Sequence, residues 1–568
     1  MQFRILTIKI TEMILKESLA MIFPVVALLA FSSCGTEYYV SPSGNDSASG
    51  RSPGKAWQSI GKINSQSFKP GDRILFQGGA SFEGSLSFDI NDSGTPDQPV
   101  TVGSYGTGKA TIRSGSDFGL YAKNVSGFIV KDLNFVGAGA DSPGEFSGIY
   151  FFTDLGTEKP EYIRIENLEV TGYRLNGIEI YGDRKGHSGF RDVGITRCRV
   201  HDNGDKGIAS VGPQPAGDWG HQDLYIGYCA VYNNRGISGK KGHTGNGIVI
   251  SSVDGGTIEY CTACNNGENS DDPESGGPIG IWAWDSREVV IQYCESYDNK
   301  TGNRADGGGF DLDGGCVGCI MQYNYSHGNH GAGYGIYQYT HAREFRDNVV
   351  RYNISENDGI NNHYGGINLW STNSSGGIQN TRIYNNTIFL SESTNGGGIA
   401  EIPDDDDTSY VYHTQVYNNI IVGVTGKTLV DIPNPSDQWK FLGNCYWTYG
   451  EDITIKWDNK VFRSLEEWRA SSDQETFENK VAGVETDPGL SSLGSGGTVG
   501  DPSMLKALTE YKLQKSSMLI DRGIDIQSMT VEDVGSHDFF GNPIPSGGGY
   551  DIGAHEFDQD ENITKTEK

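Results

Sequence analysis

Three aspartates stand in one short glycine-rich segment, Asp306-Gly-Gly-Gly-Phe310-Asp311-Leu312-Asp313-Gly-Gly. In an extended strand Asp311 and Asp313 share one face and Leu312 faces the other, so the two aspartate Cβ atoms lie about 6.6 Å apart. The carboxyl groups of inverting glycosidases lie about 6.5–9.5 Å apart, because a water must fit between them. One carboxyl would protonate the leaving oxygen and the other would activate the water, so we predict Asp311 and Asp313 as catalytic residues.

The same three carboxylates allow two other interpretations. Asp306, Asp311 and Asp313 are hard oxygen ligands that suit Ca²⁺, with Asp306 as the candidate metal ligand. In a polysaccharide lyase this ion would neutralise a uronate while a basic side chain removes a proton, and the candidate bases are Arg304, Arg343, Lys240 and Lys241. Alternatively, the aspartates only support a turn. The hydrolase interpretation requires no cofactor.

Histidines cluster in the turns after this segment, and His330, in Gly-Asn-His330-Gly, is the one we predict to assist catalysis. It could orient a carboxylate or bind a sugar hydroxyl. For any single histidine here, a surface turn is the competing interpretation.

Aromatic side chains recur beside the aspartates in a column of strands. Each of these strands begins with Gly-Ile or a close variant, and if the Ile points inward its neighbours point outward. Exposed Trp and Tyr side chains stack on the apolar faces of sugar rings, while polar groups bind the hydroxyls. The alternative is that long loops cover these rings. We predict as substrate-binding residues Trp282, Trp284, Tyr337, Tyr339, Asn368, Trp370, Glu179 and Arg343.

The elements that must position these residues form a repeat. Cys198, Cys229, Cys261 and Cys294 are spaced by 31, 32 and 33 residues, and an Asn or Asp follows each repeat unit at a fixed offset. Short alternating strands separated by Gly/Asn turns predict a solenoid whose coils stack on one another. The cysteines would form an inward column and the asparagines a bonded ladder of turn residues. The pairs Cys261/Cys264 and Cys316/Cys319 leave zinc, a disulfide or free thiols open.

We therefore predict an all-β protein, a single right-handed parallel β-helix with coils of about 30 residues. A short capping helix is expected within residues 51–66 and an irregular cap at the C-terminal end. The expected boundaries are 38–115 for the N-terminal cap and first coils, 116–445 for the repeats, 446–557 for the last coils and cap, and 558–568 for a polar tail.

The chain opens with Tyr38-Tyr39-Val40-Ser-Pro-Ser-Gly-Asn-Asp46 and closes with Tyr550-Asp-Ile-Gly-Ala-His-Glu556. With the coils between them, these segments resemble exported bacterial right-handed parallel β-helix proteins of the pectate-lyase-like and polygalacturonase-like group. The resemblance implies carbohydrate substrates. The polygalacturonase series of Asn-Thr-Asp, Asp-Asp, Gly-His-Gly and Arg-Ile-Lys is not found, so no catalytic residue is carried over from that family.

Residues 1–33 predict a signal peptide. Lys9 and Lys16 precede an apolar stretch, and small residues stand directly before Cys34, as in a bacterial lipobox. We expect the protein to be exported. It would either be attached to a bacterial outer membrane, through lipidated Cys34 alone, or lie in the periplasm or outside the cell. The net charge of −29 excludes nucleic acid as a partner and disfavours long polyanions. The expected partner is a polysaccharide or oligosaccharide, and the expected oligomeric state a monomer.

Three functions compete. The first is a glycoside hydrolase that uses Asp311 and Asp313. The alternatives are a polysaccharide lyase, with or without Ca²⁺, and a non-catalytic glycan-binding surface protein. The crowded aspartates favour the hydrolase, whereas the acidic surface disfavours a lyase for polyanions.

Overall fold

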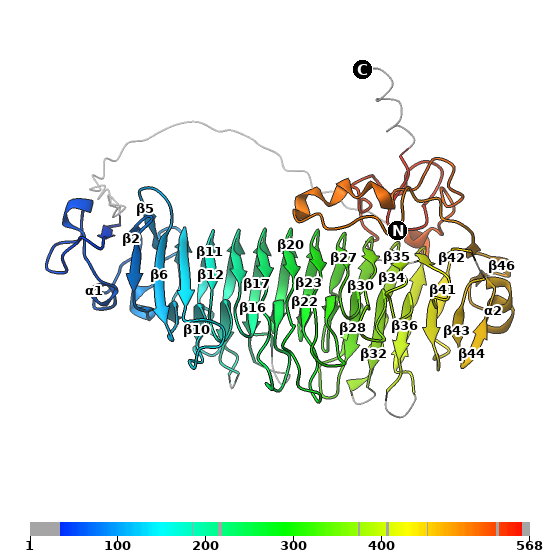
Figure 1. Cartoon of the computed structure of the whole chain (residues 1–568), viewed down its shortest axis with the longest axis horizontal. Helices are drawn as coiled ribbons and strands as arrows, with labels where there is room; N and C mark the ends of the chain where they lie inside the picture. Colours follow the sequence, from blue (N-terminus) through cyan, green and yellow to red (C-terminus); the bar gives the residue numbers. More distant parts are fainter. Residues whose placement is uncertain are drawn as a thin grey trace, which may run out of the picture. The chain divides into compact units, whose positions relative to one another are not determined.

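The computed structural model describes residues 35–558 except 185, 214–217, 373–374, 405–407, 451 and 530–532. The predicted signal peptide, the lipidation at Cys34 and all of the predicted polar tail except Asp558 lie outside these residues. The described chain winds as a parallel β-solenoid with about 31 residues per turn (Figure 1). The predicted fold class is therefore confirmed.

Three sheets of 14 strands, here called A, B and C, form the wall of the solenoid. Each coil contributes one strand to each sheet in the chain order A, B, C. Neighbouring strands are parallel, apart from the antiparallel β43–β44 pair that ends sheet C.

Sheet A contains β1 (Glu37–Val40), β2 (Arg73–Gln77), β5 (Val100–Tyr105), β8 (Phe128–Lys131), β11 (Glu161–Glu166), β14 (Arg191–Thr196), β17 (His221–Gly227), β20 (Val253–Glu259), β23 (Arg287–Gln292), β26 (Ile320–Gln322), β30 (Val349–Arg351), β34 (Arg382–Tyr384), β38 (Gln415–Tyr417) and β41 (Lys440–Leu442). Sheet B contains β3 (Ser81–Glu83), β6 (Ala110–Gly115), β9 (Leu133–Gly137), β12 (Glu169–Thr171), β15 (Arg199–His201), β18 (Ala230–Tyr232), β21 (Thr262–Cys264), β24 (Glu295–Tyr297), β27 (Tyr325–His327), β31 (Ile354–Glu356), β35 (Thr387–Leu390), β39 (Ile420–Gly423), β42 (Cys445–Thr448) and β47 (Val484–Glu485). Sheet C contains β4 (Leu86–Phe88), β7 (Leu120–Lys123), β10 (Ile149–Thr153), β13 (Ile178–Gly182), β16 (Lys206–Val211), β19 (Asn246–Ser251), β22 (Ile279–Trp284), β25 (Gly308–Leu312), β28 (Tyr334–Gln338), β32 (Ile367–Ser371), β36 (Ile399–Ile402), β40 (Val430–Ile432), β43 (Ile455–Trp457) and β44 (Lys460–Phe462).

The strand that carries the aspartates has the predicted orientation. Phe310 and Leu312 are fully buried in the main hydrophobic core, so Asp311 and Asp313 belong to the opposite, outer side of sheet C. The predicted register of the next coil is wrong by two residues. Alignment of Gly335-Ile336 with Gly309-Phe310, by the Gly-Ile pattern, would pair Phe310 with Ile336 and Asp311 with Tyr337. In the structure Phe310 pairs with Tyr334, and Asp311 pairs with Gly335. Because the error is an even number of residues, every side chain keeps its face.

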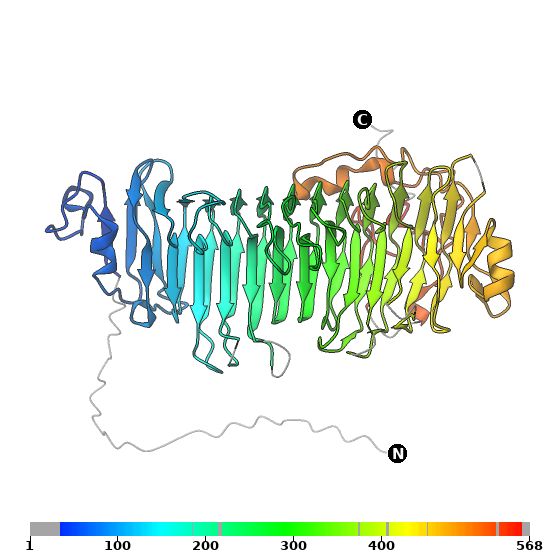
Figure 2. The same ribbon diagram turned by 60° about the horizontal axis from the view of Figure 1, so that its bottom comes forward.

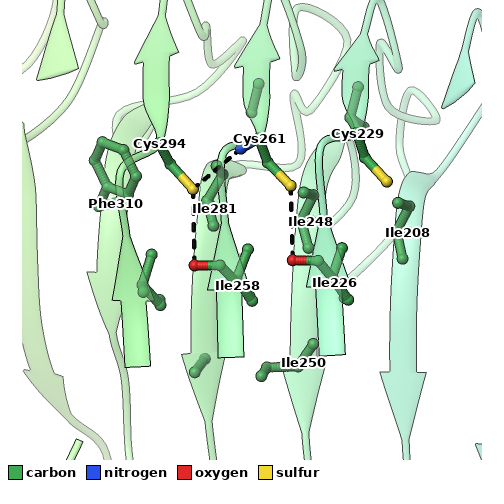
Figure 3. Packing of buried hydrophobic residues seen from close by; sticks show 14 of the residues in the cluster. Ile208, Ile226, Cys229, Ile248, Ile250, Ile258, Cys261, Ile281, Cys294 and Phe310 are labelled. Atoms are coloured by element: carbon green, nitrogen blue, oxygen red, sulfur yellow. Dashed lines mark hydrogen bonds between the residues drawn. The ribbon is translucent and has the colours of Figure 1, made fainter. Parts of the chain in front are cut away.

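The inward columns are continuous through the middle of the solenoid. The four spaced cysteines are buried at the turn from sheet A to sheet B. Figure 3 shows three of them, Cys229, Cys261 and Cys294, in successive coils. All eight cysteines in the described part of the chain are free thiols. In later coils the same position is Asn324, which accepts a hydrogen bond from the Cys294 amide at 3.0 Å.

The predicted asparagine ladder is also present. Asn266 Nδ2 donates to Asn299 Oδ1 at 3.0 Å, and Asn299 Nδ2 donates to Asn329 Oδ1 at 2.9 Å. The left-handed backbone belongs to the preceding residue of each turn, such as Asn265 with φ 53°, and not to the ladder asparagine itself. The ladder therefore provides hydrogen-bond partners for buried backbone groups in the turns and links each coil to the next.

Short helices cover the two ends of the core. Within the predicted segment, α1 (Ile60–Asn64) is capped by Ser59 and buries Ile60 and Ile63. At the other end, α2 (Leu465–Ser472) buries Trp468 against the last coils.

The polypeptide after β47 folds back along the solenoid (Figures 1 and 2). Its helical elements are the 3₁₀ helices Pro502–Ala507 and Thr509–Tyr511 and α3 (Ile526–Met529). The amides of Val499 and Gly500 donate to Glu295 on β24, and Asn385 Nδ2, next to β34, donates to the backbone oxygen of Asp551. These contacts lie on sheets A and B.

Candidate active site

Loops on both sides of sheet C rise around its outer face. The loops that enter sheet C after β18, β21 and β24 carry His243, Gly276 and Asp306. The loop that leaves β28 carries Tyr339. Asp313 follows directly after β25, the strand that precedes β28 in sheet C.

The first cavity, of about 370 Å³, opens over β25, β28 and β32. This volume falls in the range of small-ligand pockets, roughly 300–1,000 Å³. The lining side chains combine two carboxyls, aromatic rings and a few polar groups. They are His243, Ser275, Gly276, Ala305, Asp306, Asp313, Tyr337, Tyr339, Tyr364, Trp370 and Ile402.

A second cavity, of about 470 Å³, lies on the N-terminal side of the first. Its floor is formed by small side chains of β16 and β19, including Ala209 and Val249, and Trp282 and Trp284 also line it. His243, Asp313 and Tyr339 line both cavities. The two cavities therefore form one groove across successive coils, with Asp313 at its middle.

Asp313 is 7% exposed, and its Oδ1 accepts a hydrogen bond from the Gly314 amide at 2.7 Å. Burial raises the pKa of Asp313 to about 6, and the negative charge of Asp306 adds to this. The charge of His243 and the Gly314 amide act in the opposite direction. A carboxyl with this pKa holds a proton in mildly acidic solution and can donate it.

Asp306 approaches the same space from its loop. Its Oδ2 accepts a hydrogen bond from the Gly277 amide at 2.7 Å and lies 3.9 Å from His243 Nδ1. Burial raises the pKa of Asp306, while the nearby His243 charge and the Gly277 amide favour the ionised form. These two contacts offset part of the effect of burial on Asp306.

Asp311 does not line either cavity. It is 2% exposed, beside Trp282 in the preceding coil and Gly335 in the next. A Cβ at residue 335 would lie 2.8 Å from Asp311 Oδ1 and 2.6 Å from the Tyr337 ring, so only glycine leaves room for both. Burial and the charges of Asp313 and Asp306 raise the pKa of Asp311 well above its usual range, which favours its neutral form.

The predicted aromatic residues do gather around the groove, but two of them are not exposed. Trp282 is 3% exposed and donates its indole N–H to Asn246 Oδ1 at 2.9 Å; Tyr337 is 6% exposed. The expectation of an open platform is wrong for both, because the loops that carry His243 and Tyr364 pack over them. Trp284, Tyr339 and Trp370 are partly exposed and line the cavities.

The other predicted site residues lie outside the lining. His330 Nδ1 accepts a hydrogen bond from the Thr301 amide, and Glu179 accepts one from Ser147 Oγ at 2.7 Å. Arg343 Nε donates to Asp285 at 2.6 Å, and Asn368 is fully buried.

Several lining residues were missed by sequence reasoning. His243, Ser275 and Tyr364 stand in loops without the repeat, so no periodicity points to them. Lys206 and Arg184, which line the second cavity, also lie outside the outward positions of the predicted columns. Ile402 could have been found, because it pairs with Trp370 in the column of outward side chains.

In the described residues, no group of three or more His, Cys, Asp or Glu side chains is arranged to hold a metal ion. The Ca²⁺ site with Asp306 therefore stays a prediction. Within the same residues, no helix is long and apolar enough to cross a membrane.

The comparisons with known proteins agree with the winding of the chain. A family model described as "Right handed beta helix region" matches residues 118–350. The chain is a right-handed parallel β-helix. The solved structure of XylC in complex with xylose has a TM-score of 0.50 at 12% identity and covers 92% of this chain and 98% of that one.

Two lacto-N-biosidases are also similar. The lacto-N-biosidase of Bifidobacterium longum is 25% identical over 653 residues, which cover 93% of this chain and 37% of the relative. The chain thus spans little more than a third of that curated relative. The crystal structure of the GH136 lacto-N-biosidase from Eubacterium ramulus is 18% identical, with a TM-score of 0.49, and covers 70% of this chain and 68% of that one.

Proposed function

We propose that this β-helix is a glycoside hydrolase that cleaves neutral oligosaccharides, with Asp313 as the general acid and Asp306 as the second carboxylate. The observation that carries the proposal is that these two carboxyls line one cavity with four aromatic side chains, Tyr337, Tyr339, Tyr364 and Trp370. The similarity along most of the chain to a protein named lacto-N-biosidase supports a glycoside hydrolase acting on oligosaccharides.

The chemistry divides between the two carboxyls. Asp313 gives its proton to the glycosidic oxygen as the bond to the anomeric carbon breaks, and the bonding electrons stay with that oxygen. Asp306, in its ionised form, either attacks the anomeric carbon or removes a proton from the attacking water. The anomeric configuration of the first product, read by NMR, separates these two routes.

The catalytic role of Asp311 stays a prediction, and the geometry favours Asp306 as the partner of Asp313. Asp311 is covered by Trp282 and Tyr337 and is best described as a neutral group beneath the groove.

The test uses p-nitrophenyl lacto-N-bioside and a panel of neutral oligosaccharides as substrates. Wild type should release new reducing ends, and Asp306→Asn and Asp313→Asn should each lose about 10²–10⁴-fold in kcat on the oligosaccharides. Asp223→Asn is the matched control, because Asp223 is exposed on sheet A with φ 54°, a conformation that asparagine accepts.

Near-normal activity of both cavity variants would contradict the proposal. Products with unsaturated ends that absorb ultraviolet light would support the lyase alternative, and glycan binding without turnover would support a binding protein.

Export and lipidation at Cys34 also belong to the proposal. This part of the proposal is supported by the sequence of residues 1–33, which resembles a signal peptide. Labelling of cells with a radioactive fatty acid should mark the wild-type protein and not Cys34→Ala; equal labelling of both would refute lipidation at this residue.

A further inference from the structure

A group of aromatic side chains lies on the outer side of sheet C, on the coils directly before the groove. This distal patch consists of Phe118, Tyr121, Tyr150, Phe152 and Tyr181. The Phe118 and Tyr150 rings stack with centroids 5.1 Å apart, and Tyr181 lies 5.9 Å from both Tyr150 and Phe152. All five side chains are partly exposed. Contiguous exposed aromatic rings on a soluble protein usually mark a binding surface.

The distal patch continues directly into the groove. Tyr181 pairs in register with Val211, which lines the second cavity. From Val211 the same column passes through Ser251 and Trp284 toward Asp313. Four coil steps at the usual strand spacing of about 4.8 Å place Tyr181 roughly 19 Å from Asp313 along the solenoid axis.

The floor of the second cavity is low next to the distal patch. Ala209, Val249 and Ser251 are small or short residues of β16 and β19, and Trp284 of β22 stands between them and Asp313. A sugar chain whose cleavage point lies at Asp313 would therefore pass Trp284 and follow the second cavity over these small residues to Tyr181.

Polar groups border the rings. Lys123 Nζ lies 5.4 Å from the centre of the Phe152 ring and pairs with Asp154 at 2.7 Å, and Asn124 Nδ2 donates to Asp154 at 2.8 Å. Ring faces edged by groups that bind hydroxyls suit sugars. The chain's net charge of −29 favours neutral sugars over uronates.

We propose that the distal patch is a second glycan-binding surface, which holds the far part of a neutral sugar chain while its cleavage point lies at Asp313. This inference rests on the proposed function and names its substrate class: chains long enough to extend beyond the groove.

The experiment uses a ladder of neutral glycans that carry the same terminal disaccharide on chains of increasing length, with p-nitrophenyl lacto-N-bioside as the shortest member. Phe152→Ala and Tyr181→Ala should raise KM for the long members about tenfold, in the manner of a lost binding hot spot. The kinetics on the shortest member should stay unchanged. Phe152→Tyr and Tyr181→Phe keep the rings and should keep the low KM.

Tyr228→Ala is the matched control, because Tyr228 is 45% exposed and follows β17 of sheet A, away from sheet C. Thermal unfolding checks that each variant is folded. Equal kinetic losses on short and long substrates, or no loss on either, would overturn the proposal that the distal patch binds glycan. So would a loss of dimers in Tyr181→Ala during sedimentation, since the patch would then be an interface between two copies of the chain.

Binding measured by calorimetry separates this inference from the proposed function. If wild type cleaves no member of the ladder, the proposed function fails. A tighter binding of long glycans that Tyr181→Ala abolishes would still support the distal surface, and identical binding of wild type and variant would overturn it.

Discussion

The pH dependence of hydrolysis follows from the environment of Asp313. Burial raises the pKa of this carboxyl from 3.8 to about 6. This difference corresponds to about 3 kcal/mol against the ionised form. Since a general acid must carry its proton, kcat/KM for oligosaccharides should fall as the pH rises through about 6. Between pH 5 and pH 7 the protonated fraction, and with it kcat/KM, should fall about tenfold.

Two variants show whether Asp313 is the group that titrates. His243→Gln removes a charge that lowers the pKa of Asp313, so the fall of kcat/KM with pH, here called the falling limb, should move to higher pH. His413→Gln, at an exposed histidine outside the groove, should leave the limb in place. Asp313→Asn should abolish the limb, with a smaller loss of kcat on p-nitrophenyl glycosides, whose leaving group needs little protonation. A falling limb that persists in Asp313→Asn would refute this account.

Three further outcomes are expected from other parts of the structure. Burial raises the pKa of Glu401 from 4.5 to about 7. The protonated group therefore contributes about 3 kcal/mol to the free energy of unfolding below pH 4.5, and this contribution is lost as the pH rises through 7. Glu401→Gln should remove this pH dependence of the free energy of unfolding, measured with urea. Asn299→Ala breaks the asparagine ladder and should cost about 3 kcal/mol of unfolding free energy, whereas a cost near zero would show that the ladder does not hold the coils. Trp284→Ala should raise KM for oligosaccharides with little change in thermal stability, and an unchanged KM would place substrate outside the second cavity.

The periodic part of the molecule was predictable from the sequence. Inward residues such as Phe310 and Leu312 repeat in every coil and must stack on their neighbours, so their burial follows from alternation alone. The asparagine ladder and the cysteine column follow from the same spacing.

The coil at β28 was harder to place. Tyr334 and Ile336 both suit an inward position, and the Gly-Ile pattern favoured the wrong one as the partner of Phe310. The structure stacks Tyr334 on Phe310, with ring centroids 5.2 Å apart, and bonds the Tyr334 hydroxyl to backbone oxygens inside the core. A hydroxyl that finds buried partners cannot be recognised from spacing.

The loops decide which carboxyl faces the groove, and they carry no repeat. Asp306 was predicted only as a metal ligand, because its distance from Asp313 depends on how residues 298–307 return to sheet C. The cover over Asp311 likewise depends on loops of unequal length, including those with His243 and Tyr364.

A crystal structure of Asp313→Asn with a bound oligosaccharide tests the central claim most directly. The account predicts a glycosidic oxygen within hydrogen-bond distance of residue 313 and the neighbouring anomeric carbon facing Asp306, with a sugar ring against Trp370 or Tyr339. An oligosaccharide bound elsewhere, or one whose glycosidic bonds all lie beyond the reach of residues 306 and 313, would contradict it.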